Sequence, residues 1–236
     1  MKLPVKLIEA ELELFERKFK DAAKSNVQML DRIMHYIVKR KGKQIRPMFV
    51  FLSAKLHGEI NESTYRAAAL VELLHTATLV HDDVVDESTL RRGRQTANNI
   101  WGSKASILVG DYLFTQSIEL MVDSGNPTIL KLFANTALEI SCGEVKQLSN
   151  RHNPTLTFEE YFDVIRAKTA LLFAASACIG PMLSDASKKI QDSLYAYGLH
   201  LGNAFQLIDD ALDYCSDAKT IGKNIAKFRE LKSMSV

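Results

Sequence analysis

The sequence predicts an all-α protein whose residues 1–236 form a single helical domain. Apolar residues recur at steps of three and four along nearly the whole chain, which is the spacing of one helix face. Runs of alternating apolar and polar residues, bounded by hairpin signals such as Asn-Gly, are missing. The sequence also has no internal repeat, low-complexity segment or linker, which favours one compact bundle over two domains.

Seven breaks, most of them rich in residues that favour turns, divide the helical pattern into about nine helices. They lie at residues 41–46, 57–61, 91–98, 123–127, 150–157, 180–185 and 216–222. Segments 169–184 and 193–208 contain no Lys, Arg, Asp or Glu. Each is shorter than the ~20 residues that span a bilayer and is interrupted by polar or Gly/Pro residues. We therefore expect buried helices there and no transmembrane segment.

Charge and cysteine content argue against several classes of function. The 30 basic and 28 acidic residues leave a net charge of +2, so nucleic-acid binding is not indicated. Cys142, Cys178 and Cys215 are widely spaced, which argues against a disulfide framework or a zinc site. The N-terminus lacks the apolar core and cleavage site of a secretion signal. These features predict a protein of the reducing cytoplasm.

Two aspartate motifs with the same spacing each follow an apolar helical run. The first aspartate motif is Asp82, Asp83 and Asp86, and the second is Asp209, Asp210 and Asp213. On a helix, the first and last aspartates share a face, and the middle one is turned by about 100°. Mg²⁺ prefers hard oxygen ligands shared with substrate phosphates, so the pair of motifs predicts Mg²⁺ sites. One such aspartate motif alone would more often be a solvated acidic helix end than a metal site.

Basic residues near the first aspartate motif predict an anionic ligand. Lys43 and Arg46 precede the motif, and Arg91, Arg92 and Arg94 follow it. Arginine can bind phosphate oxygens through two parallel hydrogen bonds, and lysine adds a point charge. Each basic cluster alone would more often be surface charge. Together with six carboxylates, they predict a Mg²⁺–diphosphate site.

The order of these motifs resembles the trans-isoprenyl diphosphate synthase family. The resemblance extends from about residue 43 to 224 and includes GKQIRP, LLHTATLVHDD, NIWGSKASILVGDYLF, RAKTA, FQLIDDALDY and IGKN. It implies a helical bundle of the isoprenoid synthase type around a central active-site cavity. The implied Mg²⁺-dependent reaction joins isopentenyl diphosphate head-to-tail to an allylic prenyl diphosphate. Within the family the sequence is most similar to bacterial long-chain synthases of the octaprenyl type, which make quinone side chains.

The resemblance also implies roles for individual residues. Isopentenyl diphosphate would be bound by Lys43, Arg46, His75 and Arg92. The allylic diphosphate would be bound by Arg91, Lys168, Thr169, Gln206 and Lys223. Three of these cations, Arg91, Lys168 and Lys223, would be catalytic because they would stabilise the charge of the leaving group. The metal ligands would come from the two aspartate motifs.

Helix spacing supports some of these roles and predicts a further one. His75 lies seven residues before Asp82 and shares its face, although a core histidine satisfied by a neighbour is an alternative. Ala77 and Thr78 lie about one turn below Asp82. By resemblance, small residues there leave a tunnel open for a long product. The alternative is that small residues merely allow close helix packing.

Other interpretations stay open on the sequence alone. A terpene cyclase also has a first DDxxD motif, but its second metal motif is an Asn/Asp, Ser/Thr, Glu pattern. A His-Asp phosphohydrolase is suggested by His81-Asp82, although the other histidines lack matching metal spacing. We expect His81 to be structural and Asp111 to be a buried partner of an arginine.

The resemblance implies a homodimer whose interface the sequence does not locate. Family members continue past IGKN with further helices, which we expect to be missing here. A noncatalytic or defective subunit of the same fold is therefore the remaining alternative to an active enzyme.

Overall fold

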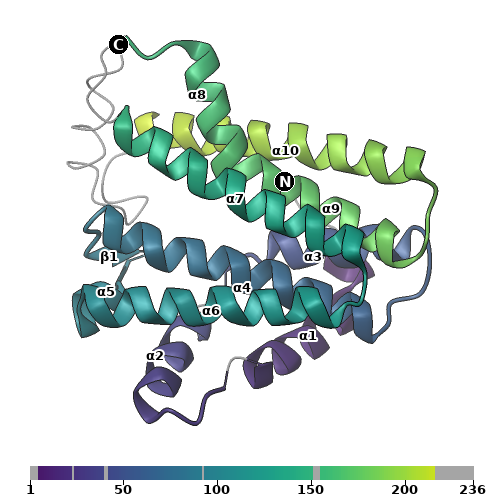
Figure 1. Cartoon of the computed structure of the whole chain (residues 1–236), viewed down its shortest axis with the longest axis horizontal. Helices are drawn as coiled ribbons and strands as arrows, with labels where there is room; N and C mark the ends of the chain where they lie inside the picture. Colours follow the sequence, from purple (N-terminus) through teal and green to yellow (C-terminus); the bar gives the residue numbers. More distant parts are fainter. Residues whose placement is uncertain (1–4, 23, 40–41, 92, 151–154, 216–236) are drawn as a thin grey trace.

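The computed structural model describes residues 5–22, 24–39, 42–91, 93–150 and 155–215 (Figure 1). Within these ranges nearly all regular structure is helical, which confirms the predicted all-α class. The α-helices are α1 (Glu9–Ala22), α2 (Gln28–Val38), α3 (Ile45–Lys55), α4 (Glu62–Val85), α5 (Ala97–Trp101), α6 (Ser103–Asp123), α7 (Pro127–Ser149), α8 (Phe158–Ile165), α9 (Leu171–Leu183) and α10 (Lys188–Cys215). A short 3₁₀-helix, η1 (Val5–Leu7), precedes α1.

Helix α4 lies at the centre of the bundle, where it packs against α6, α3 and α9. Figure 1 shows α7, α9 and α10 on one side of α4, with α1 and α2 on the other. Apolar side chains fill the space between these layers, among them the fully buried Leu73, Phe133 and Phe173. Nearly all of α9 is buried, as its lack of charged residues predicts. None of the described helices is both long and apolar enough to cross a bilayer.

Local sequence signals explain where several helices begin. The side chain of Asn61 accepts a hydrogen bond from the backbone N–H of Thr64 and caps α4. Asn126 caps α7 directly before Pro127, whose fixed φ suits the first turn. Thr157 and Glu160 form a reciprocal capping box at the start of α8. These starts follow the predicted breaks at 57–61, 123–127 and 150–157.

Close backbone contacts at two glycines hold α10 against Ala170 and Ala174, which lie just before and within α9. A Cβ atom on Gly202 would lie 2.4 Å from the Cα of Ala170, and one on Gly198 would lie 2.7 Å from the Cα of Ala174. Both distances are shorter than real Cβ contacts, so only glycine permits this approach. The pair of glycines therefore fixes the position of the helix that carries the second aspartate motif.

Two local features differ from the predicted pattern of helices joined by loops. Strands β1 (Leu90–Arg91) and β2 (Arg94–Gln95) form a small antiparallel hairpin that overlaps the predicted break at 91–98. Gly93 has a φ of 72°, a conformation that a turn of this kind requires and that glycine adopts without strain. A five-residue π-helix, η2 (Arg166–Ala170), joins α8 to α9. Both features lie beside the aspartate motifs.

Candidate active site

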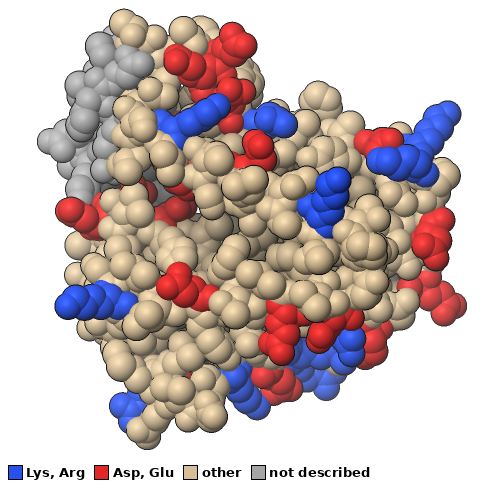
Figure 2. All heavy atoms as spheres, viewed as in Figure 1, with Lys and Arg blue, Asp and Glu red and all other residues tan. Residues whose placement is uncertain are grey.

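The two aspartate motifs lie at one end of the bundle. The first is at the C-terminal end of α4, and the second is in the last turns of α10 (Figure 1). Acidic side chains border a hollow at this end of the molecule in the space-filling view (Figure 2). Asp209 and Asp210 are half-buried, whereas the side chain of Asp213 is outside the described residues.

Lys168 links the first aspartate motif to α7. Its Nζ atom lies 2.8 Å from Oε1 of Glu144, 3.2 Å from Oε1 of Gln147 and 3.5 Å from Oδ2 of Asp82. Asp82 comes from α4, whereas Glu144 and Gln147 lie one turn apart on α7. The ammonium group therefore connects two helices through carboxylate and amide oxygens.

A second set of hydrogen bonds connects the π-helix to the second aspartate motif. Thr169 Oγ1 donates to Oε1 of Gln206 at 2.7 Å, and Nε2 of Gln206 donates to Oδ1 of Asp210 at 3.1 Å. The hydroxyl of Tyr161 on α8 donates to the other carboxylate oxygen of Asp210 at 2.6 Å. These bonds hold the side chain of Asp210 from two sides.

The π-helix explains how neighbouring residues reach both aspartate motifs. Lys168 and Thr169 are consecutive, yet one contacts the first motif and the other contacts Gln206 of α10. An extra residue in a helical turn alters the direction of the side chains, and such turns are frequent at functional sites. The segment RAKTA thus brings the two acidic helix ends into one network.

The pKa values of Asp82, Glu144 and Lys168 are all raised, for different reasons. Burial raises the pKa of Asp82, and the charges of Lys168 and Arg91 oppose the rise. Burial and the charge of Asp82 raise the pKa of Glu144. Burial disfavours the charged form of Lys168, but Asp82 and Glu144 outweigh it and raise the pKa of the ammonium. The site therefore holds a protonated lysine between two carboxyl groups, each of which loses its proton less readily than an exposed carboxyl group does.

The middle residue of the first aspartate motif has a different set of contacts. Oδ1 of Asp83 lies 2.7 Å from Nε of Arg91, and the Asp83 side chain is only 9% exposed. The backbone carbonyl of Asp83 accepts a 3.1 Å hydrogen bond from Nδ2 of Asn98. Asp83 thus attaches the β1–β2 hairpin, which carries Arg91, to the end of α4.

The donor set suits Mg²⁺ in an open site. Asp82, Asp86 and Asp209 offer hard carboxylate oxygens, the ligand type that Mg²⁺ prefers. Among the residues whose side chains are described, no three acidic, histidine or cysteine side chains are arranged to hold a metal ion by themselves. Water or substrate oxygens would have to complete the coordination, as is usual for Mg²⁺.

The residues predicted to bind isopentenyl diphosphate lie near the start of α3 and along α4. Lys43 is exposed in the loop before α3, and His75 is half-buried on α4. The guanidinium carbon of Arg46 lies 4.7 Å from the ring centroid of Phe173. Arg92 and Lys223 are outside the described residues, so their predicted roles have no structural description.

The two residues predicted to control chain length differ in environment. Ala77 is 1% exposed and lies in the core, whereas Thr78 is half-buried. Thr78 Oγ1 donates to the backbone carbonyl of His75 at 2.8 Å. Thr78 lies four residues before Asp82 and so about one turn below it on α4.

One expectation about the polar residues near α6 is wrong. Asp111 is exposed and lies 3.3 Å from Nε2 of His81, so it is not a buried partner of an arginine. The His81 ring packs against Gly110, where a Cβ atom would lie 2.2 Å from Nε2. This contact supports the structural role predicted for His81.

Sequence reasoning missed Glu144, Gln147 and Tyr161. Their contacts join residues far apart in the chain, so only a weak local signal was available. The spacing of Glu144 and Gln147 was the available signal, because residues three apart on a helix share a face.

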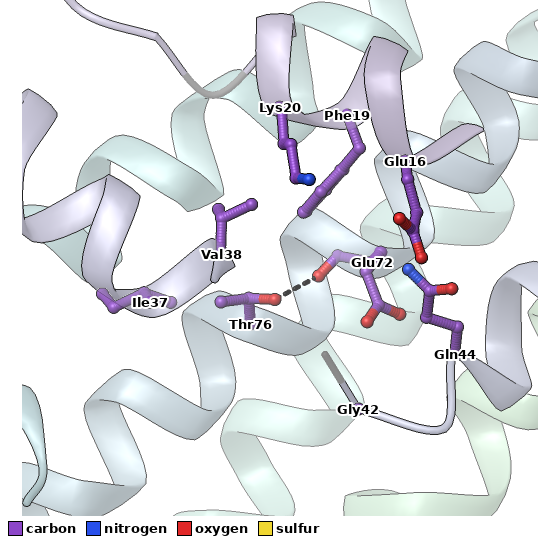
Figure 3. A pocket seen from close by; sticks show the side chains of 9 residues that line it. All are labelled: Glu16, Phe19, Lys20, Ile37, Val38, Gly42, Gln44, Glu72 and Thr76. Atoms are coloured by element: carbon purple, nitrogen blue, oxygen red, sulfur yellow. Dashed lines mark hydrogen bonds between the residues drawn. The ribbon is translucent and has the colours of Figure 1, made fainter. Parts of the chain in front are cut away.

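A separate pocket lies between α1, the end of α2, the loop before α3 and α4 (Figure 3). Carboxylates of Glu16 and Glu72 and the amide of Gln44 line it, and Thr76 Oγ1 donates to the Glu72 carbonyl at 2.7 Å. Gln44 precedes α3 and has a φ of 48°. Gly42 and Gln44, the residues on either side of Lys43, both line the pocket, so it borders the loop before α3.

Comparisons with known proteins identify the family of the chain. The polyprenyl synthetase family model matches residues 27–233. The chain is 44% identical to octaprenyl diphosphate synthase of Escherichia coli over 201 residues, which cover 85% of this chain and 62% of that protein. It is 45% identical to all-trans-nonaprenyl-diphosphate synthase (geranyl-diphosphate specific) of Rhodobacter capsulatus over 202 residues, with the same coverage of each. The chain thus spans about 62% of the length of these relatives.

Solved structures of the same family have the same fold. A polyprenyl synthase from Caulobacter crescentus, complexed with calcium and isoprenyl diphosphate, superposes with a TM-score of 0.91 and 42% identity. The match covers 96% of this chain and 69% of that one. A decaprenyl diphosphate synthase from Rhodobacter capsulatus superposes with a TM-score of 0.86 and 40% identity, over 93% and 68% of the two chains. The matched family model, the relatives and the helical bundle lead to one assignment: this chain belongs to the polyprenyl synthetase family.

Proposed function

We propose that the protein is a Mg²⁺-dependent prenyltransferase that makes a long-chain all-trans polyprenyl diphosphate, a precursor of quinone side chains. It would condense isopentenyl diphosphate head-to-tail with an allylic prenyl diphosphate. The observation that supports this most is the π-helix, whose Lys168 contacts Asp82 and whose Thr169 contacts Gln206 beside Asp210. Two acidic helix ends with a lysine between them suit a diphosphate bound together with divalent cations.

In the proposed reaction the allylic C–O bond breaks, and its electron pair leaves with the diphosphate. The alkene of isopentenyl diphosphate attacks the allylic carbon, and loss of a proton restores a double bond. Mg²⁺ held by Asp82, Asp86 and Asp209 would supply positive charge that stabilises the leaving diphosphate. Lys168 and Arg91 would add fixed cationic charge at the same group. The departing diphosphate itself is the proposed acceptor of the proton.

The remaining predicted residues are assigned to the same two substrates. Lys43, Arg46, His75 and Arg92 would bind isopentenyl diphosphate, while Thr169, Gln206 and Lys223 would bind the allylic diphosphate. Asp83, Asp210 and Asp213 complete the two aspartate motifs, although Asp83 and Asp210 also bind Arg91 and Tyr161 through their carboxylates. The apolar walls of α4 and α9 would keep water away from the reactive carbon.

A homodimer is part of this proposal. Apolar residues on one face of α6 are exposed, including Ile107, Phe114 and Ile118, and a second copy would cover them. The compartment that we propose is the reducing cytoplasm, as predicted from the three widely spaced cysteines. Light scattering at micromolar concentration should give twice the mass of one chain, and a monomer would contradict the dimer.

The direct test is prenyl transfer by the purified protein. Farnesyl diphosphate, labelled isopentenyl diphosphate and Mg²⁺ should yield a labelled long-chain product that extracts into an organic solvent. A metal chelator should abolish the product, and added Mg²⁺ should restore it. Incorporation of label no greater than with heat-denatured protein would contradict the proposed function.

A further inference from the structure

Lys168 is shared unequally by carboxylates on two helices. Its ammonium lies 2.8 Å from Glu144 on α7 but 3.5 Å from Asp82 on α4. Gln147, one turn further along α7, adds an acceptor at 3.2 Å. The lysine therefore lies closer to α7 than to the first aspartate motif.

The distance between α7 and the π-helix is fixed by a contact next to Glu144. A Cβ atom on Gly143 would lie 2.5 Å from the Cβ of Ala167, so the two backbones approach as closely as glycine allows. Glu144 and Lys168 directly follow these two residues in the sequence. The backbone contact thus places the carboxylate of Glu144 within reach of the ammonium.

The position of the ammonium matters for Asp82. A lysine that bound Asp82 closely would occupy a carboxylate oxygen and compete with a divalent cation. The side chains of Lys168, Glu144 and Asp82 are 29%, 28% and 13% exposed, so salt screens these charges less than surface ones. If the charge of Glu144 were removed, Asp82 would be the acidic group left within 4 Å of Lys168 among the described side chains.

We propose that Glu144 is a positioning residue, which holds the Lys168 ammonium beside α7 and so leaves Asp82 available to a divalent cation. The inference rests on the proposed function, because it takes Asp82 as a metal ligand. It adds a role for a residue that touches neither the metal nor the substrate. Glu144 acts on metal binding only through Lys168.

The test measures binding of Mn²⁺, which prefers the same oxygen ligands as Mg²⁺ and is visible by electron paramagnetic resonance. Four variants of the whole chain are titrated with Mn²⁺ alone: Glu144→Gln, Lys168→Gln, the double variant and Glu139→Gln. Glu139 is the matched control, since it is an exposed acid on α7 and its change removes the same charge. Circular dichroism and the thermal midpoint identify any variant that fails to fold.

Glu144→Gln should weaken Mn²⁺ binding by roughly threefold to thirtyfold, which lies within the range of coupling between contacting residues. The control should stay within about twofold of the parent, since its charge is exposed to solvent. The double variant should bind Mn²⁺ as tightly as Lys168→Gln does. If Glu144 had only a structural role, Glu144→Gln would weaken Mn²⁺ binding whether or not Lys168 were present.

Two results would overturn the proposal. Unchanged Mn²⁺ binding in Glu144→Gln would show that Glu144 does not protect Asp82. A loss of the same size in the Lys168→Gln background would show that Glu144 is a ligand or a packing residue. Failure of the proposed function is separate, because the parent itself would then bind no Mn²⁺ and transfer no prenyl group.

Discussion

The Nε atom of Arg91 donates a 2.7 Å hydrogen bond to Oδ1 of Asp83, so the middle residue of the first aspartate motif binds the neighbouring hairpin. On α4, Asp83 is turned by about 100° from Asp82. The backbone carbonyl of Asp83 also accepts bonds from Ser88 N–H and Asn98 Nδ2. Asp83 is thus placed to position Arg91 for the allylic substrate.

The pairing predicts that Asp83→Asn raises the KM for farnesyl diphosphate by roughly tenfold, as expected when a hydrogen bond to a charged group worth about 1.5 kcal/mol is lost. The Mg²⁺ concentration that gives half-maximal rate should change little. Steady-state kinetics with each component varied separately measures both quantities.

Asp82→Asn is the matched comparison for Asp83→Asn, because it makes the same chemical change one residue earlier. It should raise the Mg²⁺ requirement strongly. If the two variants raised the Mg²⁺ requirement equally, Asp83 would be a metal ligand in the same sense as Asp82, and its role as a positioning residue would be wrong.

Loss of the first carboxylate of either aspartate motif should weaken binding of the allylic substrate without unfolding the protein. Asp82→Ala and Asp209→Ala should each weaken Mg²⁺-dependent binding of a non-reactive allylic thiolodiphosphate by at least about tenfold. Helical content should be retained, and Asp82→Ala relieves repulsion from Asp86 and Glu144. Titration calorimetry and circular dichroism measure the two effects.

Asp192→Ala serves as the control for Asp209→Ala. Asp192 is an exposed carboxylate at the other end of α10, where it pairs with Lys188. Its removal should leave analogue binding at the parent level. Parent-like binding in Asp82→Ala or Asp209→Ala would mean that the altered residue is not a ligand.

The close approach of α10 to the π-helix should be sensitive to a single methyl group. Gly202→Ala places a Cβ atom 2.4 Å from the Cα of Ala170, beside the bond from Thr169 to Gln206. Overpacking of this kind costs about 1–3 kcal/mol, more than the ≈ 1 kcal/mol that alanine gains over glycine in a helix. Thermal unfolding should therefore show a lower midpoint than the parent.

Ala204→Ser, two residues further along α10, is the control because Ala204 is exposed. Its thermal midpoint should be close to that of the parent. A midpoint for Gly202→Ala at or above the parent value would show that α10 can move away at little cost, and that this contact does not fix the second aspartate motif.

The sequence predicted where several helices begin, and it predicted that both aspartate motifs lie at helix ends, because both features depend on local signals. Asn61, Asn126 and Thr157 each begin a helix through a hydrogen bond within three residues, and such bonds can be read from the chain. The similar spacing of the two aspartate motifs also needs no tertiary structure. These local features were enough to place both motifs at helix ends.

Contacts between helices could not be predicted from the sequence. Glu144 lies 24 residues before Lys168, and Tyr161 lies 49 residues before Asp210, so each pair depends on how the helices pack. The π-helix was missed because RAKTA has neither proline nor glycine to mark a change of helical geometry. The hairpin that binds Asp83 was missed because each strand has only two residues.

Product length offers a test of the residues one turn below the first aspartate motif. Ala77 and Thr78 are small, and a phenylalanine at either position would narrow the space under the reacting carbon. Ala77→Phe and Thr78→Phe should each give shorter products than the parent, measured by chromatography of the dephosphorylated prenols. Ala77 is 1% exposed, so its replacement also costs about 1–3 kcal/mol of stability. Thr78 is half-buried and should accept the larger side chain more readily.

Thr76→Phe is the matched control, because Thr76 is on the same helix but lines the separate pocket of Figure 3. It should leave the product length unchanged, since its side chain faces the pocket that α1 and α2 line and not the core around Ala77. The comparison separates a tunnel from general crowding of the helix. An unchanged product from a folded, active Thr78→Phe variant would favour the alternative, in which small residues serve only close packing between α4 and its neighbours.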